Sequence, residues 1–85
     1  MNDDNYRFDE REEVYRQLAQ GQIEMGDAIR RLRKILKIKQ RDFAKTIGID
    51  IRVLSDFERS QGNLRTSTIA KIITPFGLKL TARRI

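Results

Sequence analysis

The chain of 85 residues is long enough for one small domain with a single core. It has neither Cys nor His, which excludes disulfides and thiolate sites and removes the commonest general base and metal ligand. No apolar run of about 18 residues and no signal-peptide pattern is present. We therefore expect a cytoplasmic protein that is not an enzyme and holds no cofactor or metal.

Charge is distributed unevenly along the chain. Residues 1–25 hold seven acidic and three basic side chains, a net charge of −4, whereas residues 26–85 hold fifteen basic and five acidic ones, a net charge of +10. A basic excess concentrated in about sixty residues is typical of proteins that bind polyanions. Many small basic domains bind no particular partner, so the charge becomes informative only beside a motif.

The N-terminal part predicts a tail followed by a short helix. Residues 1–8 are polar and lack periodicity, which is typical of a loose terminus. From Asp9, which can cap a helix, Val14 and Leu18 share one face, and Gly21 is a suitable stop. This apolar stripe is thin, so the helix needs another element to pack against.

Three further helices are predicted in the middle of the chain. The first runs from Met25 to about Leu36, with apolar residues at spacings of three and four. The second covers Gln40–Ile47 and ends at Gly48, which readily adopts a left-handed conformation. Asp50 is a good cap for the third, from Ile51 to about Arg59.

A loop over residues 60–65 leads to the last predicted helix. Thr66 or Ser67 can cap it, and Pro75 should end it near Thr74 because proline lacks the amide that a helix interior needs. Residues 78–83 then change to a period of two, which predicts a β-strand. A single strand in a helical chain needs a partner, so we expect dimerisation through its apolar positions Leu78, Leu80 and Ala82.

The segment from Gln40 to Arg59 fits the geometry of a helix-turn-helix. Two short helices flank a Gly48-Ile49-Asp50 turn, and Ala44 lies five residues before Ile49. A small residue there lets the helices approach closely, and the glycine permits the sharp turn. In such a unit the second helix enters the major groove of DNA.

The sequence QRDFAKTIGIDIRVLSDFERS resembles the Cro/repressor (XRE-type) helix-turn-helix family. The matching positions are Gln40, Phe43, Ala44, Gly48, Ile49, Leu54, Ser55, Phe57 and Glu58, while Asp50, Val53 and Ser60 depart from the pattern. The resemblance implies an all-α, lambda-repressor-like five-helix domain over residues 25–77. Residues 1–24 would be an acidic helical extension, and residues 78–85 a C-terminal dimerisation strand similar to that of the HipB-type antitoxins.

Four residues on the exposed side of the predicted recognition helix are candidates for base contacts. Arg52 suits guanine O6 and N7, or alternatively a phosphate, and Ile51 suits a thymine methyl or packing against the turn. Ser55 is a candidate for a weaker contact. Asp56 could accept a hydrogen bond from cytosine N4, or could disfavour wrong sequences by repulsion.

Residues around the motif are candidates for phosphate contacts. Gln40 starts a helix and could grip a phosphate together with the helix N-terminus, or act only as a cap. The other candidates, each alternatively an ordinary solvated side chain, are Lys39, Arg41, Arg59, Asn63 and Arg65. The family resemblance also implies a structural ion pair between Arg33 and Glu58.

These features predict a DNA-binding transcriptional repressor that reads a palindromic operator as a homodimer. The alternative is an antitoxin that binds a protein toxin and autoregulates its operon, because DNA binding has no use for the acidic segment 1–25. An enzyme fits least, since no paired-carboxylate or phosphate-cradling pattern is present. We do not expect membrane binding, because the apolar face of helix 25–36 is needed by the core.

Overall fold

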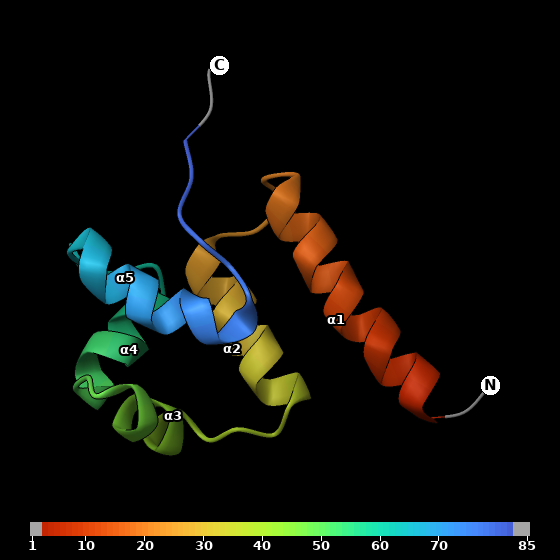
Figure 1. The fold of residues 1–85 in the computed structure, drawn as a ribbon, viewed down its shortest axis with the longest axis horizontal. Helices are drawn as coiled ribbons and strands as arrows, with labels where there is room; N and C mark the ends of the chain where they lie inside the picture. The colour runs from red at the N-terminus through yellow and green to blue at the C-terminus, as the bar shows by residue number, and fades with distance from the viewer. Residues whose placement is uncertain (1–2, 83–85) are drawn as a thin grey trace.

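The computed structural model describes the backbone of residues 3–82 and the side chains of residues 10–82. Within residues 3–82 the chain forms five α-helices and a 3-10 turn, and no β-strand: α1 (Asp3–Ala19), α2 (Met25–Ile35), α3 (Gln40–Ile47), α4 (Ile51–Glu58), α5 (Thr66–Ile73) and η1 (Thr74–Phe76). The central helix α2 separates α1, on one side, from α3, α4 and α5 on the other (Figure 1). No helix in this part of the chain has the length and apolar character needed to cross a membrane.

The core is built around one face of α2. Ile29 and Leu32 of this helix are fully buried, as are Leu54 of α4 and Ile72 of α5. Burial of each such side chain contributes roughly 1.5–3 kcal/mol to folding. The apolar spacing in residues 25–36 therefore places the centre of the fold correctly, and α3, α4 and α5 pack around it.

The N-terminal helix is longer than its sequence pattern predicts. It begins at Asp3, so the predicted start and cap at Asp9 is wrong. The apolar periodicity begins only near Val14, whereas the helix already covers residues 3–13. Periodicity could therefore indicate the packed part of α1 but not its first turns.

The packed part of α1 is tied to the C-terminal end of the domain. Val14 is buried in the core cluster, and Leu18 packs against that cluster. The Tyr15 hydroxyl donates a 2.7 Å hydrogen bond to the carbonyl oxygen of Phe76. The extension thus covers α2 and contacts the turn from which the C-terminal segment leaves.

The turn between α3 and α4 has the geometry that its sequence requires. Gly48 adopts a left-handed conformation, with φ of 75°, and the Ile49 amide donates to the Ala44 carbonyl at 3.0 Å. Ala44 is almost fully buried. Asp50 caps α4 by accepting a 2.7 Å hydrogen bond from the Arg52 amide. The first turn of α4 is therefore fixed to the end of α3.

The C-terminal part differs from its prediction in two respects. The N-cap of α5 is Arg65, without a side-chain hydrogen bond, so the predicted cap at Thr66 or Ser67 is wrong. Pro75 lies in the 3-10 turn η1, after which residues 78–82 form no strand. The strand predicted over 78–83 is thus not supported within a single copy, where no neighbouring strand is described; residue 83 lies outside the described residues.

Asp27 in the first turn of α2 should make the stability of the domain depend on pH. Although burial acts to raise the pKa of Asp27, the hydrogen bonds and charges of Arg30 and Arg31 outweigh it and lower this pKa below its ordinary value of 3.8. The stabilisation is therefore present above the unfolded-state pKa and is lost as the pH falls through the lowered folded-state pKa. We expect Asp27→Asn to cost about 0.5–1 kcal/mol at pH 7 and progressively less as the pH falls through the lowered folded-state pKa, as measured by urea unfolding. A cost that stayed constant as the pH was lowered would contradict this.

Candidate nucleic-acid interface

The exposed face of α4 lines a shallow groove at the surface. All four residues predicted to contact bases lie in it, together with two of those predicted to contact phosphates; the lining residues are Gln40, Ile51, Arg52, Ser55, Asp56 and Arg59. Ile51 and Arg52 are exposed, while Ser55 and Asp56 are partly exposed. The opposite side of the same helix carries Leu54 and Phe57 into the core. Helical periodicity thus leaves the first turn of α4 open to solvent.

Ion pairing differs between the charged side chains of this groove. Arg59 donates a 2.8 Å hydrogen bond to Asp56 and forms an ion pair with it, and the Arg59 Nε group donates to the Ser55 carbonyl oxygen at 3.4 Å. Arg52 has no side-chain partner among residues 10–82. The groove therefore offers one unpaired guanidinium and one carboxylate whose charge is balanced.

Beneath the groove lies a buried ion pair between α2 and α4. Arg33 donates to both carboxylate oxygens of Glu58, at 2.9 and 2.8 Å, and also to the Ile38 carbonyl oxygen at 2.7 Å. The two side chains are 9% and 2% exposed. Gln40 donates to the same Glu58 carboxylate at 3.1 Å. The first residue of α3 is thus linked to the pair that joins α4 to the core.

The other four predicted phosphate contacts form two groups outside the groove. Lys39 and Arg41 are exposed at the start of α3, where Lys39 is the N-cap and makes no side-chain cap bond. Asn63 and Arg65 are exposed on the loop between α4 and α5. The side-chain amide of Gln40 donates a hydrogen bond to Glu58, a contact that neither of its predicted roles includes.

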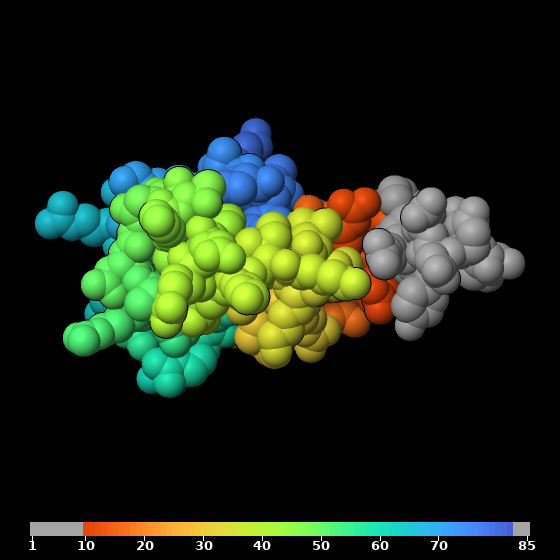
Figure 2. Space-filling view, turned by 90° about the horizontal axis from the view of Figure 1, so that it is seen from below, coloured from red at the N-terminus to blue at the C-terminus, as the bar shows by residue number. Residues whose placement is uncertain are grey.

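The basic residues of this surface lie away from the acidic extension. In Figure 2 the segments of α3 and α4 cover one end of the molecule, and the described part of α1 lies toward the other. Figure 1 shows the same separation across α2. The exposed turn of α4 therefore lies on the basic part of the chain, with no acidic helix beside it.

Comparison with known proteins agrees with this arrangement. Residues 29–82 match the helix-turn-helix family HTH_3, which is more than half of the chain. The chain belongs to the Cro/repressor (XRE-type) helix-turn-helix family. No curated protein and no solved structure matches the chain. This helix-turn-helix protein is thus a DNA-binding transcriptional regulator, with α4 at the position of the recognition helix.

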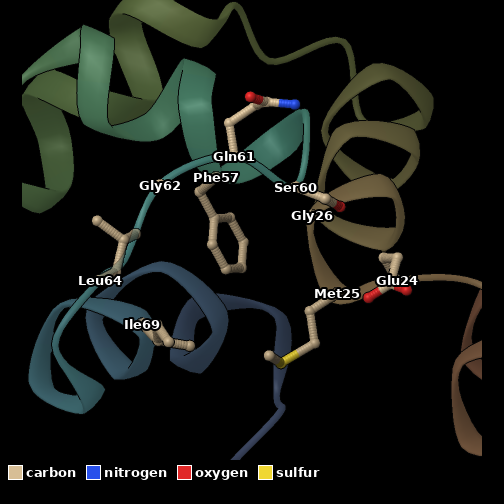
Figure 3. Close-up of a pocket in the computed structure, with 9 residues that line it drawn as sticks. All are labelled: Glu24, Met25, Gly26, Phe57, Ser60, Gln61, Gly62, Leu64 and Ile69. Carbon is tan, nitrogen blue, oxygen red and sulfur yellow. The ribbon is translucent and has the colours of Figure 1, made fainter.

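A second hollow of the helix-turn-helix domain lies where α2 begins and α4 ends (Figure 3). Its lining residues are Glu24, Met25, Gly26, Phe57, Ser60, Gln61, Gly62, Leu64 and Ile69. At this point α2 and α4 approach so closely that a Cβ atom on Gly26 would lie 1.9 Å from the Phe57 carbonyl oxygen. Sequence reasoning did not single out Gly26, because its position inside a helix gives no sign of a close approach.

The end of α4 also departs from the usual family pattern in a way that the structure explains. Ser60 stands where glycine usually ends the recognition helix, and it adopts a left-handed conformation with φ of 58°. The amides of Ser60 and Gln61 donate back to the carbonyl oxygens of Phe57 and Asp56. Ser60 thus forms the turn that glycine usually forms, although its Cβ atom makes the left-handed conformation sterically less favourable.

Proposed function

We propose that this protein is a transcriptional repressor that binds a palindromic operator as a homodimer. The observation that carries the proposal is the groove along α4, in which Arg52 is exposed and has no side-chain partner among residues 10–82. One recognition helix covers only a few base pairs, so a single copy discriminates poorly between sequences. Two copies related by a twofold axis read half-sites about 34 Å apart, one turn of DNA.

Selection of bound sites from random duplexes tests the proposal. We expect a palindromic consensus, and we expect Arg52→Ala to lose the preference at one base pair of each half-site, because Arg52 would pair with a guanine there. Lys34→Ala is the matched control: Lys34 is an exposed cation on α2 and does not line the groove, so its consensus should equal that of the wild type. Absence of any enriched duplex would refute the proposal.

The C-terminal segment is the proposed dimer contact. Residues 78–82 carry the alternating pattern, and Leu80 is 37% exposed. An apolar groove beside the segment is lined by Leu18, Met25, Ile73, Leu78, Lys79, Leu80 and Thr81. Pairing with the same segment of a second copy would bury Leu78, Leu80 and Ala82 and satisfy the backbone amides.

Replacement of Leu80 by aspartate should convert the dimer to a monomer. A carboxylate at the twofold contact is desolvated and meets its own copy, which disfavours association. Thr46→Asp introduces the same charge at an exposed position of α3 that does not line this groove, and should remain dimeric. Sedimentation of both variants measures the effect, and a dimeric Leu80→Asp protein would rule out this interface.

The second candidate function is an antitoxin that binds a protein toxin and represses its own operon. It is favoured by the acidic side chains of α1, of which Glu10, Glu12 and Glu13 are exposed. Helix α1 lies away from α4 (Figure 1). A surface of this charge suits a basic protein rather than DNA. Co-purification with the product of an adjacent reading frame supports this candidate, and a gene without such a neighbour argues against it.

A further inference from the structure

The carboxylate of Asp56 occupies a position where a DNA-binding surface ordinarily excludes negative charge. Asp56 lines the groove of α4, and its side chain is 48% exposed there. The side chain of Arg59 lies one turn further along and is 65% exposed, yet it points back to Asp56 and donates to the Oδ1 atom at 2.8 Å. The pair therefore brings a carboxylate into the groove without a net negative charge.

The second carboxylate oxygen of Asp56 remains available. Among residues 10–82, the only side-chain hydrogen bond to Asp56 is the one that Arg59 donates to Oδ1. An ionised carboxylate accepts hydrogen bonds and donates none. In the major groove the amino groups that donate are cytosine N4 and adenine N6, whereas guanine and thymine present only acceptors at the corresponding positions.

We infer that the Asp56–Arg59 pair is a specificity determinant that requires cytosine or adenine, on one defined strand, at one position of each half-site. Asp56 accepts the hydrogen bond from the base amino group, and Arg59 is the positioning residue that holds the carboxylate and offsets its repulsion by phosphates. This inference rests on the proposed reading of DNA by α4. It goes further, because it states which bases one position accepts and which it rejects.

The spacing along α4 relates this position to the one read by Arg52. Residues 52 and 56 share a helix face and are separated by about 6 Å along the axis. Successive base pairs are about 3.4 Å apart, so the two side chains address positions about two base pairs apart. Arg52 pairs with a base that accepts two hydrogen bonds, and Asp56 with one that donates. With α4 lying along the groove, each half-site thus contains a guanine and, about two base pairs away on a defined strand, a cytosine or adenine.

The test measures binding of the full-length protein to the selected duplex and to duplexes in which each base pair is replaced in turn. For the wild type we expect a loss of roughly tenfold in affinity when the cytosine or adenine on this strand is replaced by guanine or thymine, and a smaller change when cytosine and adenine are exchanged for each other. Asp56→Ala should abolish discrimination at this base pair alone, and Asp56→Asn should shift the preference toward adenine, which asparagine contacts at N6 and N7. Arg59→Gln should weaken binding to all duplexes and reduce the same preference.

A control and three contrary outcomes complete the test. Asp42→Asn removes a carboxylate from the exposed side of α3, outside the groove, and should leave the preference unchanged. An Asp56→Ala protein that retains full discrimination would overturn the inference while leaving the proposed function intact. Unchanged discrimination in Arg59→Gln would overturn the role of Arg59. A wild-type protein that selects no duplex would overturn the inference and the proposed function together.

Discussion

Replacement of Gly26 by alanine should destabilise the domain by about 3 kcal/mol or more. The added Cβ atom would lie 1.9 Å from the Phe57 carbonyl oxygen and 2.9 Å from the Phe57 carbonyl carbon, both backbone atoms of α4 that cannot rotate away. To relieve the clash, α2 and α4 must separate at the place shown in Figure 3. Urea unfolding followed by circular dichroism measures the loss.

The sign of this effect is diagnostic. At an unhindered position inside a helix, alanine is more favourable than glycine by about 1 kcal/mol, so a stabilised Gly26→Ala protein would contradict the close approach of α2 and α4. Gly21→Ala is the control. Gly21 has open space around it but a φ of 70°, so its replacement should cost only about 1 kcal/mol from backbone strain.

Loss of the Glu58 carboxylate should have the second large effect. Glu58→Ala would leave the buried Arg33 guanidinium with the Ile38 carbonyl oxygen as its remaining partner, so we expect a loss of about 3–5 kcal/mol in stability. A domain of this size has a total stability on the order of 5–15 kcal/mol, so much of the variant should be unfolded on mild heating. Thermal and urea unfolding measure this directly.

Two further variants distinguish the loss of the ion pair from the loss of side-chain volume at position 58. Glu58→Gln keeps a carbonyl oxygen for Arg33 and should be less destabilised than Glu58→Ala. The double variant Arg33→Met, Glu58→Leu removes both charges and should recover most of the loss, because apolar residues of similar volume replace buried ion pairs at little cost. If Glu58→Ala lost less than about 1 kcal/mol, the pair could not be what joins α4 to α2.

Much of the helical framework follows from local sequence. The bounds of α3 and α4 agree with prediction to within one residue, because Gly48 and Asp50 act through the chain immediately around them. The described chain has five α-helices, as predicted in chain order, and four of them lie with the turn η1 within residues 25–77. The last helix ends near Thr74, as predicted from Pro75, but the 3-10 turn that contains this proline was not predicted.

Contacts between distant residues were not predictable in the same way. The close approach at Gly26 and the hydrogen bond from Tyr15 to Phe76 depend on how helices are placed in space, which periodicity does not specify. The Asp56–Arg59 pair has the i,i+3 spacing of neighbours on a helix and could have been predicted from it. In segment 78–82 the local pattern predicts more than a single copy forms. The alternation indicates a strand, but a strand needs a neighbouring strand, and none is described in residues 3–82.

The most direct test of α4 as the DNA-reading element is the change in backbone amide chemical shifts on titration with a duplex that the protein selects. We expect the largest changes in residues 51–59 and at the start of α3, and small changes along α1, which lies beyond α2 from this surface (Figure 1). Perturbations concentrated on α1, with the amides of α4 unaffected, would contradict the account.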